Sequence, residues 1–200
     1  MEIKCLKVGQ LQTNCYLVWD ELSSDCFIID PGDDADFITT EILQLKLKPQ
    51  AILLTHGHYD HCLGCLELKL NFNIPIYLNP KDNFLYQNAS KSASHWSRSK
   101  ETFKLPPTTP IENWNLKIEN YFTVTPSPGH TPGSVCFYSA PHLFVGDTIF
   151  ENGVGRTDFS YSSSRDLQKS ITKILSYPEE TLIYSGHEYS PFFLSTLKKS

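Results

Sequence analysis

Four side chains that could bind a metal ion lie within six residues, in the segment LLTHGHYDHCLG at residues 53–64. They are His56, His58, Asp60 and His61, in a chain with only seven histidines. Because His56 and His58 are two residues apart, they would lie on one side of an extended segment but on different sides of a helix. Asp60 and His61 follow where the chain should bend into a helix, so they can approach from another direction. A loop of this kind could supply ligands to two neighbouring ions. The alternative, a polar loop that only makes local hydrogen bonds, fits poorly with so many titratable groups.

Three further segments place a histidine or an aspartate directly after a predicted strand. They supply His130 in TPSPGHTPGS, Asp147 in LFVGD and His187 in LIYSGH. In α/β folds, ligands bind at the carboxyl ends of the strands. Nitrogen and oxygen ligands without a thiolate suit zinc, iron or manganese. His95 and His142 fall outside this pattern, and we interpret them as ordinary surface or core residues.

Short apolar runs rich in β-branched and aromatic residues predict the strands that position these groups. We expect strands at residues 16–18, 27–29, 51–54, 76–78, 122–125, 135–138, 143–145 and 182–184. Apolar residues at helical spacing predict three helices. The first contains Ile38, Ile42 and Leu45 and follows a cap at Asp33 or Asp34, and the second contains Leu63, Leu66 and Leu70 behind the histidine cluster. The third contains Leu167, Ile171, Ile174 and Leu175 and follows the capping-box-like Ser163 and Asp166. Strands and helices that alternate without a repeat or a linker predict one α/β domain over residues 1–200.

The segment NASKSASHWSRSK at residues 88–100 is polar, and we predict a loop there. It has two interpretations. It is either a plain exposed insertion, or a cover over the site with Trp96 as a contact.

Composition excludes several classes of protein. The net charge of −5 argues against nucleic acid as a partner, because phosphate binding favours clustered Lys and Arg. No stretch is long and apolar enough for a membrane span, and the first 20 residues lack the apolar core of a signal peptide. We therefore expect a cytoplasmic protein that acts on a small molecule, without a membrane or nucleic acid partner.

Six cysteines need an explanation in a protein of this kind. In a cytoplasmic chain we expect free thiols that pack in the core rather than a disulfide framework. Cys62 and Cys65 have the CxxC spacing of redox motifs. A single CxxC is weak evidence, so packing on the helix is the favoured interpretation and redox chemistry the alternative.

The motifs taken together resemble the metallo-β-lactamase superfamily. They are HGHYDH at 56–61, PGHTPG at 128–133, GDTIF at 146–150 and GH at 186–187. Three more, TNCYLV at 13–18, DPG at 30–32 and GVGRTDF at 153–159, are similar to its glyoxalase II-like branch. The resemblance runs from about residue 7 to residue 189. It implies a four-layer αβ/βα sandwich, two sheets face to face with helices outside.

By this resemblance, the chain holds two divalent metal ions, zinc first, with iron or manganese as alternatives. His56, His58 and His130 would hold one metal, Asp60, His61 and His187 the other, and Asp147 would bridge them. Asp30 would support the ligands from behind, or alternatively cap the turn it shares with Pro31 and Gly32.

The chemistry implied is hydrolysis of a small acyl thioester of the hydroxyacylglutathione kind. Two metals can share a water and lower its pKa, so that the bridging hydroxide attacks a carbonyl. Asp60 would ligate a metal and orient that hydroxide, and Arg156 would anchor a substrate carboxylate. An ion pair with Asp158 that only holds the loop is the alternative for Arg156.

The chain also departs from the glyoxalase II pattern. Only residues 188–200 follow His187, so we expect no C-terminal helical substrate domain, and Asp158 stands where those enzymes have an aromatic residue. Recognition of glutathione is therefore open. The alternatives are a persulfide dioxygenase with a single iron, a lactone hydrolase of the same fold, or a non-catalytic metal-stabilised binding module.

Overall fold

Six strands form the first sheet, and their order in the sheet follows their order in the chain. They are β1 (Glu2–Val8), β2 (Thr13–Trp19), β3 (Asp25–Ile29), β4 (Lys48–Leu53), β5 (Ile76–Leu78) and β6 (Thr109–Pro110). The pairs β1–β2 and β2–β3 are antiparallel, and the pairs from β3 to β6 are parallel. Parallel neighbours need a crossover, which α1 (Ala35–Gln44) and α2 (Cys65–Phe72) provide.

The second sheet has five strands in the order β13-β12-β9-β8-β7. These are β13 (Phe192–Phe193), β12 (Leu182–Ser185), β9 (His142–Gly146), β8 (Val135–Ser139) and β7 (Thr123–Pro126). A two-stranded ribbon of β10 (Ile149–Phe150) and β11 (Gly153–Val154) follows β9, and α5 (Ser164–Ile174) leads into β12. The short α6 (Leu194–Leu197) ends the described chain.

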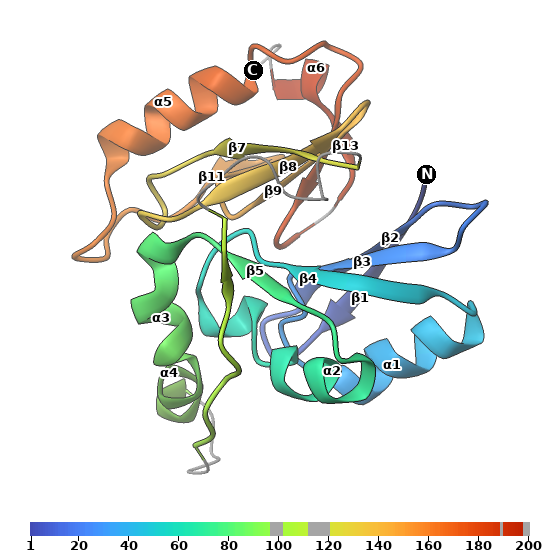
Figure 1. Cartoon of the computed structure of the whole chain (residues 1–200). Coiled ribbons are helices and arrows are strands. Elements are labelled where there is room, and N and C mark those ends of the chain that lie inside the picture. The colour runs from blue at the N-terminus through green and yellow to red at the C-terminus, as the bar shows by residue number, and fades with distance from the viewer. Residues whose placement is uncertain (97–101, 112–120, 189, 198–200) are drawn as a thin grey trace.

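The two sheets pack face to face with helices outside, as Figure 1 shows. This computed structural model describes residues 1–96, 102–111, 121–188 and 190–197. In β2, β3 and β4, alternate side chains enter different cores. Leu17, Ile28 and Ile52 pack towards α1 and α2, whereas Val18, Phe27 and Leu53 pack against the second sheet. A third core lies between the second sheet and α5.

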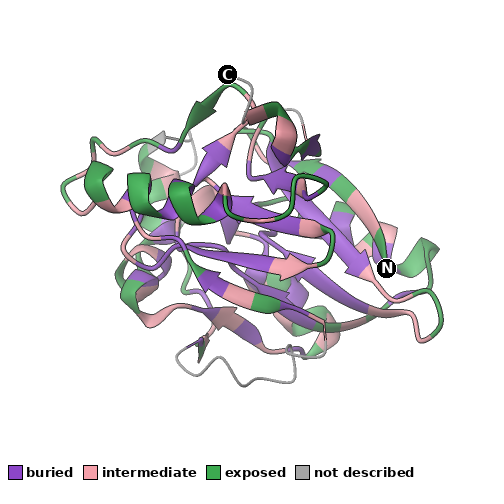
Figure 2. Cartoon of the chain, turned by 90° about the horizontal axis from the view of Figure 1, so that it is seen from above, coloured by how far each residue is buried: buried purple, intermediate pink, exposed green. Residues whose placement is uncertain are grey.

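Burial on both faces explains why these strands are apolar throughout. Figure 2 shows the strands largely buried and the outer faces of the helices exposed. The predicted four-layer αβ/βα sandwich is confirmed.

Most predicted elements are confirmed, with shifts at their ends. Ser163 caps α5 by accepting a hydrogen bond from the Asp166 backbone N–H. Asp34 is the residue before α1, but its carboxylate accepts from Gly9 N–H and does not cap the helix. In α2 the buried side chains are Cys65 and Leu68, while Leu70 is largely exposed.

The prediction of a loop at residues 88–100 was wrong for its first part. Residues Ala89–Trp96 form α4, which follows η2 (Pro80–Asp82) and α3 (Asn83–Gln87). Ala89 and Ser90 are buried, and α4 contacts the short 3₁₀ helix η1 (Tyr59–His61). Small side chains such as Ala and Ser let this helix approach its neighbours closely without a large apolar residue. Residues 97–101 and the side chain of Trp96 lie outside the described part, so a contact between Trp96 and the site stays only an alternative interpretation.

The cysteines are free thiols, and five of the six are buried. Cys62 and Cys65 belong to the core between the first sheet and its helices. Burial raises the pKa of both thiols well above the ordinary value, which makes them poor nucleophiles. The packing interpretation is confirmed. Among the described residues, no helix is long and apolar enough to cross a membrane.

Candidate metal centre

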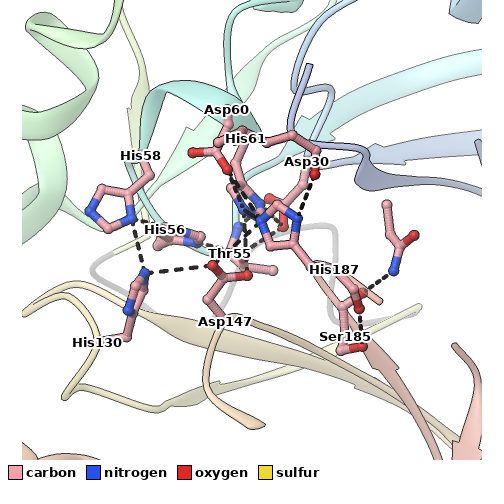
Figure 3. Close-up of polar contacts among 12 residues, drawn as sticks. Asp30, Thr55, His56, His58, Asp60, His61, His130, Asp147, Ser185 and His187 are labelled. Atoms are coloured by element: carbon pink, nitrogen blue, oxygen red, sulfur yellow. Dashed lines mark hydrogen bonds and ion pairs between the residues drawn. The ribbon is translucent and has the colours of Figure 1, made fainter. Parts of the chain in front are cut away.

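The predicted ligands gather at one edge of the two sheets, where five strands end. Asp30 follows β3, the 56–61 segment follows β4, His130 lies in the loop after β7, Asp147 follows β9 and His187 follows β12. Since β9 and β12 are parallel, their following residues meet at the same edge. Figure 3 shows these side chains pointing toward one another from both sheets.

His56, His58 and His130 form a first group whose nitrogens converge. His58 Nδ1 lies 3.1 Å from His56 Nε2 and 2.9 Å from His130 Nε2. One ligand atom from each residue lies within 4.8 Å of the other two, which is close enough for a single metal ion. We call this group the three-histidine trio.

Asp60, His61 and His187 form a second group of the same kind. Asp60 Oδ2 lies 3.2 Å from His187 Nε2 and 3.6 Å from His61 Nε2, and the two histidine nitrogens are 3.3 Å apart. We call this group the aspartate trio.

Asp147 lies between the two trios. Its Oδ1 is 3.5 Å from His61 Nε2, and its Oδ2 is 3.7 Å from His130 Nε2 and 3.6 Å from His187 Nε2. Asp147 Oδ1 is buried and has no hydrogen-bond partner in the described chain. Leaving a buried carboxylate oxygen unpaired is costly, so a cation between the trios would satisfy it.

The outer nitrogens of four histidines fix which ring nitrogen faces inward. His130 Nδ1 donates to Arg156 O at 2.9 Å, His187 Nδ1 donates to Leu11 O at 3.2 Å, and His61 Nδ1 donates to Asp30 Oδ2 at 3.1 Å. The Thr55 hydroxyl donates to Asp30 Oδ2, so it accepts from His56 Nδ1. In each neutral ring the inward Nε2 then carries a lone pair. Lone pairs that face one another at these distances suit metal coordination.

The fifth histidine has a tyrosine as its outer partner. His58 Nε2 lies 2.8 Å from Tyr161 OH, and Tyr161 stacks on Phe159. Sequence reasoning missed both aromatic residues, although Phe159 closes the GVGRTDF motif. Outer partners of this kind orient a ligand ring and tune its basicity.

Asp30 supports the ligands from behind. Besides His61, its carboxylate accepts from the Thr55 backbone N–H at 2.8 Å and from the Thr55 hydroxyl at 2.6 Å. Because these donors surround its oxygens, Asp30 is a poorer candidate for a ligand than the trios, although it also lies close to His56 and His61. Its contact with His61 fits the predicted supporting role better than a cap on its own turn.

The two trios differ in their electrostatics. Burial and the neighbouring His130 lower the pKa of His58 to about 4, so this ring is neutral at neutral pH. Burial also lowers the pKa of His61, but the carboxylates of Asp147, Asp60 and Asp30 outweigh it and raise this pKa to about 10. Without a metal, His61 therefore holds a proton that takes the place of a cation.

Metal binding is accordingly expected to release about one proton per chain near pH 7, because a ligand nitrogen must be deprotonated. In the metal-free protein, the ion pairs of protonated His61 stabilise the fold. Because the folded-state pKa of His61 is raised, this stabilisation is complete below about pH 6.5 and is lost as the pH rises towards 10. Zinc titration by calorimetry in two buffers of different ionisation enthalpy measures the proton count. Zinc binding without proton release would contradict this account of His61.

Gly186 is held against the ligands by close packing. A Cβ atom there would lie 2.3 Å from Asp147 Oδ1 and 2.7 Å from His61 Cε1. Gly186→Ala is therefore expected to displace Asp147 and to lower the metal content of the purified protein. Gly153→Ala is the matched control, because a Cβ at Gly153 meets nothing within 4 Å. Equal metal content in the two variants, measured by plasma mass spectrometry, would show that this close packing is unimportant.

Arg156 lies near the site but points its charge at Asp158. Its Nε and Nη2 donate to the two Asp158 oxygens at 3.0 and 2.8 Å, and the guanidinium lies 4.8 Å from the centre of the Phe159 ring. Both charged side chains are mostly exposed. The pair is the alternative that the sequence left open for this residue. His142 lies away from the trios and contacts Tyr184 OH.

A cavity of about 330 Å³ adjoins Asp60. The loop of Gly9, Gln10 and Leu11 lines it together with α4 and the residues that lead into α2. A volume of this order suits a small molecule rather than a polymer.

Residues 8–187 match the model of the metallo-beta-lactamase superfamily. The chain belongs to this superfamily. It is a metallo-hydrolase by this membership, and the glyoxalase II-like resemblance predicted from the motifs is confirmed. The superfamily fold implies divalent metal binding, to which the two trios are suited.

Among the relatives of this chain, the hydroxyacylglutathione hydrolase GloC of Haemophilus influenzae is 35% identical over 198 residues. That alignment covers 94% of this chain and 91% of GloC. The solved structure of the B3 metallo-beta-lactamase BLEG-1 superposes with a TM-score of 0.89 at 33% identity, covering 100% of this chain and 97% of that one. The solved structure of TTHA1623 in a di-iron-bound form superposes with a TM-score of 0.88 at 34% identity, covering 98% of this chain and 97% of that one.

Proposed function

We propose that this protein is a binuclear metallohydrolase that cleaves small acyl thioesters. His56, His58 and His130 would hold one metal ion, Asp60, His61 and His187 the other, and Asp147 would bridge them. The observation that carries this assignment is Asp147 itself, a carboxylate that faces histidines of both trios and has a buried oxygen without a hydrogen-bond partner in the described chain. Two metal ions in this arrangement supply Lewis acidity and lower the pKa of a water molecule at the reaction centre.

The residues of the chain position the reactants. In the metal-free chain, burial would raise the pKa of Asp60, but the neighbouring His61 and His187 outweigh burial and lower this pKa. Asp60 therefore stays ionised and can accept a hydrogen bond from the attacking water, which fixes the direction of attack. The hydrogen bonds of Nδ1 with Asp30 and with the Arg156 carbonyl aim the Nε2 atoms of His61 and His130 into the site, where each could bind a metal ion.

The name of the Haemophilus relative supports a thioester substrate. A thiolate leaves readily from a tetrahedral intermediate, so the site needs no strong general acid behind the leaving group. The cavity beside Asp60 would take one end of a small substrate. We propose zinc as the metal, with iron as the alternative that the di-iron relative supports.

Metal analysis of protein purified without added metal, combined with turnover of S-lactoylglutathione, tests this function. The expected result is close to two metal ions per chain and thioester hydrolysis that rises with a pKa near neutrality. Oxygen uptake with glutathione persulfide, one iron per chain and no thioester turnover would replace the hydrolase by a dioxygenase. Turnover of lactones alone would keep the centre but change the substrate class.

Arg156→Ala is expected to raise the KM for a thioester with a terminal carboxylate by less than about tenfold. Asp158 already occupies two donors of the guanidinium, and an exposed ion pair contributes little. A matched thioester without the carboxylate should be unaffected, and metal content should not change. Equal losses with both substrates, or loss of metal, would place Arg156 in the scaffold instead.

A further inference from the structure

Asp82 is a fully buried carboxylate outside both trios. It ends η2, the turn that follows β5, and the proposed function gives it no role. A buried carboxylate is expensive unless hydrogen-bond donors surround it. The identity of its donors therefore indicates what the residue does.

The donors come from the two loops that carry the three-histidine trio. Asp82 Oδ2 accepts from the Gly57 N–H at 3.0 Å and from the Thr131 hydroxyl at 2.6 Å, and Asp82 Oδ1 accepts from the Gly133 N–H at 2.6 Å. Gly57 lies between His56 and His58, and Thr131 directly follows His130. One side chain thus joins the backbone of both ligand loops.

Steric contacts at the two glycines point the same way. A Cβ at Gly57 would lie 2.7 Å from Asp82 O and 3.1 Å from Asp82 Cβ, and a Cβ at Gly133 would lie 2.5 Å from Asp82 Oδ1. The glycines of the HGH and HTPG segments are therefore needed for Asp82 to approach both loops.

The distance between the loops matters because neither loop completes the trio alone. His58 Nδ1 and His130 Nε2 are 2.9 Å apart although 72 residues separate them in the chain. We propose that Asp82 is a positioning residue for the three-histidine site, which it preorganises by fixing the spacing of these two loops. This inference rests on the proposed assignment of the trio as metal ligands.

Asp82→Asn tests the proposal, because it keeps the shape but places an amide NH₂ against N–H or O–H donors. Dissociation constants for zinc come from competition with a chromogenic chelator, and His187→Ala, which impairs the aspartate trio, assigns the two sites. Asp82→Asn should weaken the three-histidine site about 10- to 100-fold, the usual effect of losing an outer partner. The dissociation constant for zinc at the aspartate trio should change by less than about threefold.

Thr131→Val removes one of the three donors and keeps the test decisive if Asp82→Asn folds poorly. It should weaken the same site in the same direction, by a smaller factor. Tyr177→Phe is the control, since it removes a hydrogen bond to Thr125 and leaves the three donors of Asp82 in place, and it should leave both constants unchanged.

Two results would overturn the role of Asp82. They are unchanged zinc affinity at the three-histidine site in both variants, or equal loss at the two sites in proportion to lost thermal stability. If instead the parent chain bound no zinc at the three histidines, the proposed function itself would fail. The parent titration therefore separates the two failures.

Discussion

Asp147→Asn is expected to abolish nearly all hydrolysis, with a fall in kcat of at least about 10³-fold. Asp147 approaches the inward nitrogens of histidines of both trios, at 3.5 to 3.7 Å. Asparagine keeps its size but removes the charge, so both metal sites should weaken together. Steady-state kinetics and metal analysis of the same preparation measure the two effects.

Asp158→Asn is the control for this variant, because Asp158 is an exposed aspartate that pairs with Arg156. It should keep its metal content and most of its kcat. Loss of metal from only one site in Asp147→Asn would contradict a bridging role.

Asp60→Asn is expected to lower kcat by about 10²- to 10⁴-fold while the three-histidine trio keeps its metal. The residue is a member of the aspartate trio and the group we propose to orient the attacking water. The variant should therefore bind close to one metal per chain with high affinity. Metal titration followed by thioester turnover at saturating substrate gives both numbers.

Asp33→Asn provides a matched comparison, since Asp33 lines the same cavity as Asp60 but belongs to neither trio. Its kcat should stay within about threefold of the parent value, since Asp33 takes no part in the proton transfer whose loss costs at least about 10²-fold. Full activity of Asp60→Asn would show that a single metal site is sufficient and that the binuclear assignment is wrong.

The sandwich was predictable because its strands are apolar on both faces and end in polar motifs. Residues 51–54, for example, precede His56, and the structure ends β4 at Leu53. The edge strand β1 was missed, since EIKCLKV mixes charged and apolar residues in the manner of a half-exposed segment. The helix α4 was missed because its buried side chains include small ones such as Ala89 and Ser90, and small polar runs are read as loops.

The site was predictable where a motif carries its own chemistry. The seven proposed ligands stand in short motifs, and the structure brings all of them to one edge. Thr55, Tyr161 and Asp82 could not be assigned in the same way, because each has a partner that is distant in the sequence, such as Asp30 for Thr55. Tyr161, for instance, contacts His58 across 103 residues, which is a result of folding that no local pattern contains.

Stepwise zinc titration of the metal-free protein tests the central claim, that hydrolysis needs both trios loaded. Zinc binding and S-lactoylglutathione turnover are followed in the same sample. We expect two bound zinc ions per chain, with most of the activity appearing as the second ion binds. Full activity at one zinc ion per chain, with no further gain on adding a second, would contradict it.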